Sequence, residues 1–219
     1  MALSSLVEAI ALAASRKLQI DEGELSGWWA PVLGGRTDEA QLYLYDLLPG
    51  GAGYARAVGL ALEEVLDATE ELLSTCDCAQ SCYRCIRHYR NNYIHGSLDR
   101  HLALALLRHI RYSTNPTVSG SESASASIGL REYLLLRGIP HESGVPVGDV
   151  EVPIIVRPGG REVWVDFHHA LIDPEAAPSG VALKARAFFK ELVEVDVFTL
   201  AHDLPSAVGR FRFQQDQTS

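Results

Sequence analysis

The stretch Cys76-Asp-Cys78-Ala-Gln-Ser-Cys82-Tyr-Arg-Cys85 contains all four cysteines of a chain of 219 residues. Thiolates are soft ligands that suit tetrahedral zinc, and sites made of cysteine alone are usually structural. Such a site is closed, so it leaves no position at which a metal-bound water reacts. The spacing therefore predicts one structural zinc ion bound by Cys76, Cys78, Cys82 and Cys85.

Other interpretations of the cysteines are weaker. An iron–sulfur cluster also uses four thiolates, but the run Cys-x2-Cys-x2-Cys-x3-Cys, typical of bacterial clusters, is absent. Disulfides between residues packed so closely would strain their geometry, and metal-free thiols would not explain the clustering. His88 and His95 lie near enough in sequence to replace a cysteine, although a surface or nucleic-acid-facing position is the simpler expectation.

Helical periodicity on both sides of the cysteines places them in a loop between two helices. Helices are predicted over 2–18, 54–73 and 98–110, with Ser97 as the N-cap of the last. A loop is expected at residues 23–31 and a strand at 41–48. The predicted fold class is α+β, with a small mixed sheet, flanking helices and a four-cysteine zinc loop between two helices.

Composition divides the chain into three parts. Residues 1–116 contain the cysteines and are expected to form a zinc-binding domain. Residues 117–127 are rich in serine and nearly free of large apolar side chains, which predicts a flexible linker or loop. Residues 128–219 alternate helical and strand patterns and are expected to form an α+β segment.

Net charge is −9, which argues against a surface coated in basic residues. The N-terminus lacks the basic start of a signal peptide, and no apolar run is long enough for a membrane span. These features predict a cytoplasmic protein. Charge is nevertheless uneven, because residues 63–77 carry six acids and no base, whereas residues 84–112 carry six arginines and one acid.

The arginine-rich segment interleaves cations with tyrosines, a pattern suited to phosphates and bases. The candidate nucleic-acid-binding residues are Arg84, Arg87, Arg90, Arg100, Tyr83 and Tyr89, with Tyr93, Arg108 and Arg111 in the same segment. The competing interpretation is a solvated face that is neutralised by the acidic helix at 63–77.

A glycine loop joins the strand at 41–48 to the next helix. Asp46, Gly50, Gly51 and Gly53 are predicted to be structural, the glycines as a tight turn and Asp46 as an acceptor for backbone amides. Phosphate binding at the helix start is the alternative, but the loop is neither a Walker motif nor a dinucleotide fingerprint.

Three ordered elements together resemble a known family. They are Tyr45-Asp46-x2-Pro49-Gly50-Gly51-Ala52-Gly53-Tyr54, then Cys76-x-Cys78-x3-Cys82-Tyr83-x-Cys85-x3-Tyr89-x-Asn91, then His95-x2-Leu98-Asp99-Arg100. Over residues 2–112 the chain resembles the zinc-binding domain at the C-terminus of MrfA-type superfamily 2 DNA helicases, which also occurs in DISARM-type phage-defence proteins.

The resemblance implies four cysteine ligands on one zinc and a non-catalytic region of an ATP-dependent DNA helicase that acts in DNA repair or phage defence. Its partners would be helicase motor domains in cis or a helicase subunit in trans, and DNA. The chain has no Walker lysine loop and no Asp-Glu-x-His box, so no catalytic residue is carried over. Its start inside an apparent helix favours a fragment over a separate subunit.

Residues 128–219 raise an alternative function, a small restriction-endonuclease-like nuclease subunit with a structural zinc. Asp166 would be the first carboxylate for a divalent cation, and Glu194 and Asp196 would face one side of a strand. Lys184 and Lys190 lie on the preceding predicted helix, outside the Glu-x-Lys spacing that such sites use. A module that binds a helicase but no DNA is a third possibility.

Overall fold

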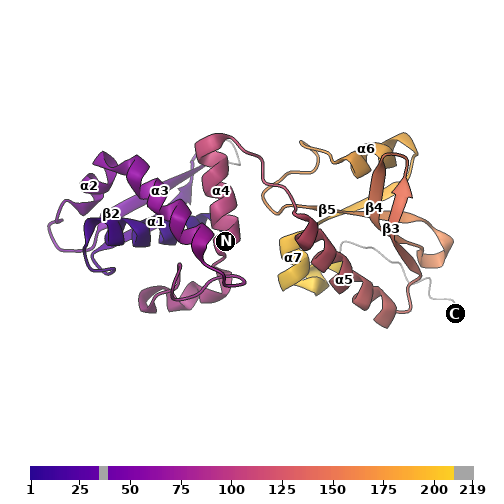
Figure 1. Ribbon diagram of the computed structural model, residues 1–219, viewed down its shortest axis with the longest axis horizontal. Helices are drawn as coiled ribbons and strands as arrows, with labels where there is room; N and C mark the ends of the chain where they lie inside the picture. Colours follow the sequence, from indigo (N-terminus) through magenta and orange to yellow (C-terminus); the bar gives the residue numbers. More distant parts are fainter. Residues whose placement is uncertain (35–38, 210–219) are drawn as a thin grey trace. The chain divides into compact units, whose positions relative to one another are not determined.

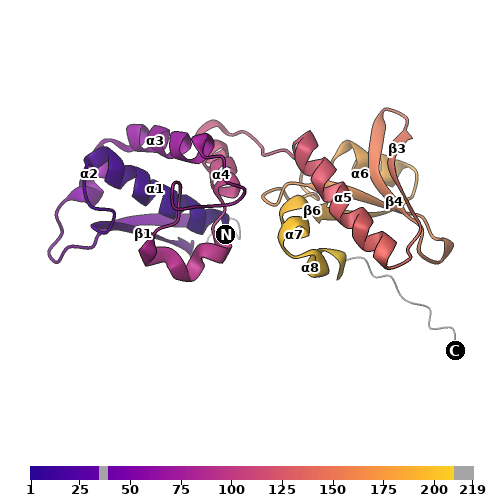
Figure 2. The same ribbon diagram turned by 60° about the horizontal axis from the view of Figure 1, so that its bottom comes forward.

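The structure, a computed structural model, describes residues 1–34 and 39–209. The chain divides into two compact units, Met1–Thr114 and Asn115–Ser219. Figures 1 and 2 show helices around a small sheet in each unit. The predicted α+β class, with the cysteines in a loop between helices, is confirmed. In the described ranges, no helix is both long enough and apolar enough to cross a bilayer.

Unit 1 is built around α1 (Ala2–Leu18). Leu6, Ala9, Ile10 and Ala14 of this helix are buried in the core of the unit. The small alanines let other elements approach the helix closely. The elements packed most extensively against α1 are α3 (Leu62–Thr75), α4 (Arg100–Tyr112) and β1 (Leu25–Pro31).

Strand β1 corrects the loop expected at residues 23–31. It pairs antiparallel with β2 (Ala40–Asp46), and Trp28 lies opposite Tyr43. Gly27 and Pro31 disfavour a strand locally, but Gly27 is needed because a Cβ there would lie 2.5 Å from a Val7 side-chain carbon. Tertiary packing against α1 therefore decides the conformation of this segment.

The helix predicted over 54–73 is two helices, α2 (Tyr54–Leu60) and α3, which are separated at Ala61. Gly59, a poor helix former, precedes the break. After the cysteines, a 3-10 segment, η1 (Tyr89–Ser97), leads to α4. The N-cap of α4 is Asp99 and not Ser97, because the Asp99 carboxylate accepts the Leu102 amide at 2.8 Å.

Unit 2 has a four-stranded sheet in the order β3-β4-β5-β6. The strands are β3 (His141–Val147), β4 (Val150–Val156), β5 (Val163–His168) and β6 (Glu191–Asp196). The first three are antiparallel neighbours, a short 3-10 turn, η2 (Pro158–Gly160), lies between β4 and β5, and β6 runs parallel to β5.

One face of this sheet packs on α5 (Gly120–Leu136), α7 (Val197–His202) and α8 (Leu204–Gly209). The other face packs on α6 (Gly180–Ala187). The sheet is therefore buried on both sides, consistent with the apolar run from Val163 to Val165.

The Ser-rich linker expected at 117–127 is wrong over most of its length, because α5 begins at Gly120. Ser119 accepts the Glu122 amide and the Glu122 side chain accepts the Ser119 amide, which forms a capping box. Ala126, Leu130 and Leu134 then pack into the core of unit 2. Helix capping and burial therefore override a serine-rich composition.

Candidate metal centre

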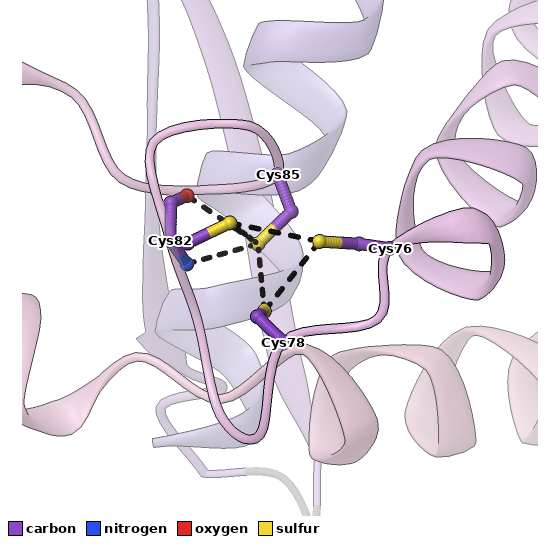
Figure 3. A group of neighbouring side chains, drawn as sticks. All are labelled: Cys76, Cys78, Cys82 and Cys85. Carbon is purple, nitrogen blue, oxygen red and sulfur yellow. Dashed lines mark hydrogen bonds between the residues drawn. The ribbon is translucent and has the colours of Figure 1, made fainter.

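The four cysteines come from the end of one helix and the tight turn that follows it. The helix α3 ends at Thr75, and Cys76 continues in an extended conformation toward Cys78. The chain then turns at Cys82, whose carbonyl accepts the amides of Cys85 and Ile86 at 3.1 and 3.2 Å. Figure 3 shows the four side chains pointing toward one another.

The sulfur geometry matches a single tetrahedral ion. Sγ–Sγ distances are 3.5 Å for Cys76–Cys78, 3.6 Å for Cys76–Cys82, 3.7 Å for Cys78–Cys85 and 3.8 Å for Cys82–Cys85. All four ligand atoms lie within 4.8 Å of one another. A tetrahedron with Zn–S bonds of about 2.3 Å has edges of about 3.8 Å, so these residues fit zinc.

The metal-free thiols differ in acidity. Burial opposes ionisation of Cys82, but its Sγ accepts the Arg84 amide at 3.4 Å and meets the neighbouring thiols, which lowers its pKa to about 6. Burial and hydrogen bonds from the other cysteines raise the pKa of Cys78 to about 12. Burial also raises the pKa of Cys85. Metal binding must therefore displace protons from Cys78 and Cys85 at neutral pH.

Arg100 holds the cysteine loop in place. It was predicted to bind nucleic acid, and the structure corrects that prediction. Its Nε donates to the Cys78 carbonyl at 2.8 Å, and its Nη1 donates to the Leu73 carbonyl at 3.0 Å. The residue is only 8% exposed. The guanidinium therefore caps the last turn of α3 and fixes the cysteine loop, instead of facing a ligand in solvent.

A polar network places the segment after the cysteines against α1. Glu8 Oε2 meets His88 Nε2 and accepts a hydrogen bond from Asn91 Nδ2, both at 2.9 Å. His95 Nε2 lies 2.9 Å from Asn91 Oδ1. The two histidines are therefore engaged away from the thiols, so the structure disfavours them as replacement ligands.

Sequence reasoning did not single out Glu8 or give Asn91 a role. The available signal for Glu8 was that it is the one acid in the predicted helix over residues 2–18 and has apolar neighbours on both sides in the sequence. Asn91 is 1% exposed, and a buried amide needs partners, but that burial is visible only in the fold.

The other predicted nucleic-acid residues lie on the surface to different degrees. Tyr83 and Tyr89 are 66% and 83% exposed, and Arg84 is exposed beside Asp77. Arg87 is half-buried and donates from Nε to Ser81 Oγ at 2.8 Å. Arg90 is exposed and donates to the Gly23 carbonyl at 3.1 Å. These side chains come from one short segment after the turn at Cys82.

Arg108 and Arg111 are paired with the acidic helix. Arg108 Nε donates to Glu70 at 2.8 Å, and Arg111 donates to Asp67 at 2.6 Å and to Glu70 at 3.3 Å. The neutralisation that competed with nucleic-acid binding is therefore real for α4. In the segment from Tyr83 to Arg90 it reaches Arg84, which forms an exposed pair with Asp77, and within the described residues no ion pair joins Arg87 or Arg90 to the acids of 63–77.

In the glycine loop, the Asp46 carboxylate accepts the Gly53 amide at 2.6 Å and the Ala55 amide at 2.8 Å. The hydrogen bond from the Ala55 amide is the main cause of the lowered pKa of Asp46. Gly50, Gly51 and Gly53 all have positive φ, which glycine adopts without strain. A carboxylate from the chain itself thus occupies the amides that a phosphate would need.

In unit 2, Asp166 and Glu194 lie opposite each other on the parallel strands β5 and β6. Burial raises the pKa of both carboxyls, although the Ser179 hydroxyl and the Phe167 amide donate to Asp166. Asp196 is the N-cap of α7 and accepts the Thr199 amide at 2.7 Å. Asp166 and Asp196 thus have structural roles that do not require a metal.

The two lysines considered for a nuclease site are held by other carboxylates. Lys184 pairs with Asp149 at 2.7 Å, and Lys190 pairs with Glu162 at 2.9 Å. These pairs engage both lysines away from Asp166 and Glu194.

Comparison with known proteins gives a family for part of the chain. Residues 6–86 match the model of the MrfA Zn-binding domain. The chain is 36% identical over 179 residues to the Druantia protein DruE of Escherichia coli (strain UMEA 4076-1), an alignment that covers 78% of this chain and 10% of that protein. The chain thus spans about a tenth of the length of this relative.

A solved structure, the DUF1998 helicase MrfA bound to DNA, aligns with 49% of this chain and 13% of its own chain, at 19% identity and a TM-score of 0.36. The matched residues include most of α1, the glycine loop and all four cysteines, and they end before η1 and α4. Residues 6–86 are therefore similar to the MrfA Zn-binding domain.

Proposed function

We propose that this chain is a zinc-binding, non-catalytic accessory region of a superfamily 2 DNA helicase. The observation that carries the proposal is the set of four Sγ atoms with the spacing of one tetrahedral ion, in a stretch that matches the MrfA Zn-binding domain. Four protein ligands complete the coordination of zinc, so the ion stabilises the loop and does not activate a substrate.

Mechanically, zinc joins the end of α3 to the turn that starts the exposed segment of tyrosines and arginines. Tyr83, Arg84, Arg87, Tyr89 and Arg90 contact DNA in this proposal, by stacking on bases and by pairing with phosphates. Helicase motor domains, in cis or in trans, supply ATP hydrolysis. DNA repair and phage defence are the processes in which such a region would act.

The chemistry of the site also favours the cytoplasm. Four thiolates within 4.8 Å of one another would oxidise readily in a secretory compartment, whereas the reducing cytosol keeps them available for metal.

Elemental analysis and an absorption spectrum of the purified protein test the metal assignment. One zinc per chain and a colourless sample are expected. Iron with sulfide and a brown colour would instead show a cluster, although thiolates of a multi-iron cluster bind different irons and would be spaced more widely than these. Four titratable thiols without metal would refute the site.

Titration of labelled single-stranded DNA across salt concentrations tests the nucleic-acid role. Affinity should fall as salt rises, and Arg84→Ala should reduce the slope of log affinity against log salt by about one. Arg108→Ala is the control on α4, because its partner Glu70 is largely buried, whereas the pair between Arg84 and Asp77 is exposed at both ends and gives way more easily to a phosphate. Equal slopes for the wild type and both variants would contradict the assigned surface.

A further inference from the structure

A small cavity lies in unit 1 between α1, the start of β1 and η1. Its volume is about 70 Å³, and its lining includes Glu8, Ser26, His88, Arg90, Asn91 and Tyr93. No zinc-site cysteine lines it. The cavity thus adjoins the segment that the proposed function assigns to DNA, but it is separate from the metal.

The cavity has a fixed polar floor. Glu8 is held by His88 and Asn91, and Asn91 is itself held by the Ile86 carbonyl at 2.9 Å. Within the described residues, both hydrogen bonds of Glu8 end on Oε2. The second carboxylate oxygen is therefore available to a donor that enters the cavity.

The rim holds a cation and an aromatic ring. The guanidinium of Arg90 packs so closely on Gly23 that a Cβ at Gly23 would lie 2.3 Å from Nη2. Arg90 Nη1 also donates to the Gly23 carbonyl, so the backbone orients this exposed side chain. Tyr93 is 80% exposed, which leaves its ring open to a stacking partner.

We infer that the cavity receives the hydrogen-bonding edge of one unstacked nucleobase that carries an exocyclic amino group. The amino group donates to the Glu8 carboxylate, the ring stacks on Tyr93, and Arg90 pairs with the adjoining phosphate. Thymine presents carbonyl oxygens on both sides of its single N–H, so a carboxylate floor disfavours it. The lining also includes Glu22, which pairs with Arg16 at 3.6 Å. A lysine from a protein partner would also suit Glu8, but it would leave Arg90 without the anion that the phosphate of a nucleotide supplies.

This inference rests on the proposed DNA contact, so the test separates the two. Zinc-loaded full-length chain is titrated against two labelled 12-mers, one of thymidines only and one with a single central cytidine. We expect the cytidine oligonucleotide to bind roughly tenfold more tightly. Glu8→Gln should reduce that preference to about twofold or less while binding persists. Zinc content and melting temperature verify that the variant is folded.

Tyr93→Ala gives a second readout at an exposed position where folding is not at risk. It should weaken binding of the cytidine oligonucleotide roughly tenfold and remove most of the preference, whereas Tyr93→Phe keeps the ring and should retain both. If Glu8→Gln proves unstable, the comparison of Tyr93→Ala with Tyr93→Phe tests the base site by itself.

Two results would overturn the inference. One of them refutes the base site alone, and the other also refutes the proposed DNA contact. Equal binding of both oligonucleotides, unchanged by Glu8→Gln and Tyr93→Ala, would refute the base site and leave the DNA contact standing. Absence of binding to either oligonucleotide at low salt would refute the DNA contact and the base site together.

Discussion

Arg100 illustrates how a residue of the cysteine loop can be misread from sequence. It lies in a basic segment, yet it donates to carbonyls 22 and 27 residues earlier in the chain. The cysteines could be assigned because their spacing is local and their ligand chemistry is specific. The role of Arg100 depends on how α3 and α4 pack, and no periodicity or composition encodes that contact.

Arg100→Ala should destabilise unit 1 by about 2–4 kcal/mol, because two buried carbonyls lose charge-assisted hydrogen bonds. Chemical denaturation of the zinc-loaded protein measures the change. The matched control is Arg84→Ala, which removes an exposed arginine from the same loop and should leave the transition unaltered. If the two variants behave alike, Arg100 does not have the supporting role described.

Zinc affinity should rise with pH. The raised pKa values of Cys78 and Cys85 mean that both thiols lose protons when zinc binds at neutral pH. Because at least these two protons are released, the apparent dissociation constant should fall at least about a hundredfold per pH unit near pH 7. Below pH 6 the dependence should become steeper, since Cys82 is then protonated as well. Competition with a chelator of known affinity at pH 5.5, 7 and 8 measures this, and a flat profile would contradict thiolate ligation.

Among the secondary-structure elements, α5 and β1 were not predicted from the sequence patterns. A serine-rich composition indicated a linker, although the capping pair Ser119 and Glu122 was already visible. Gly27 and Pro31 indicated a loop, although pairing with β2 makes a strand. Helices α1 and α4 were predicted nearly as they are, because their apolar stripes are long and regular.

Ser119→Ala should reduce the stability of unit 2 by about 1 kcal/mol, because the N-cap of α5 loses its hydrogen bond to the Glu122 amide. Thermal or urea unfolding followed by circular dichroism gives the value. Ser125→Ala serves as the control, since Ser125 is exposed in the interior of the same helix and alanine is the better helix former there. A Ser119→Ala variant as stable as the wild type would show that α5 does not depend on this cap.

At the scale of the whole molecule, zinc is expected to stabilise only one of the two units. The cysteines lie entirely in Met1–Thr114, and Cys85 belongs to its core cluster. Unit 2 has a separate core around Leu130, Ile154 and Val165.

Removal of zinc with a strong chelator should therefore unfold unit 1 and leave unit 2 folded. Hydrogen exchange resolved by peptide would show loss of protection in α1, α3 and α4 but not in β4 and β5. Cys82→Ser should reproduce the effect without chelator. Uniform loss of protection in both units would contradict independent cores.

The contacts of α1 also have a consequence for how the protein is made. Several polar partners of this helix come late in the chain, since Glu8 bonds residues 80 and 83 positions away and Ser5 accepts the amide of Asp99, 94 positions away. At ribosomal speeds of about 5–20 residues per second, α1 waits roughly 5–20 s for these partners. During that interval its apolar stripe lacks the cover of α4, and metal capture by the cysteines comes near the end of the wait. Among the helices of unit 1, α1 is thus made first and is among the last to be secured, which makes nascent unit 1 a natural client for chaperones.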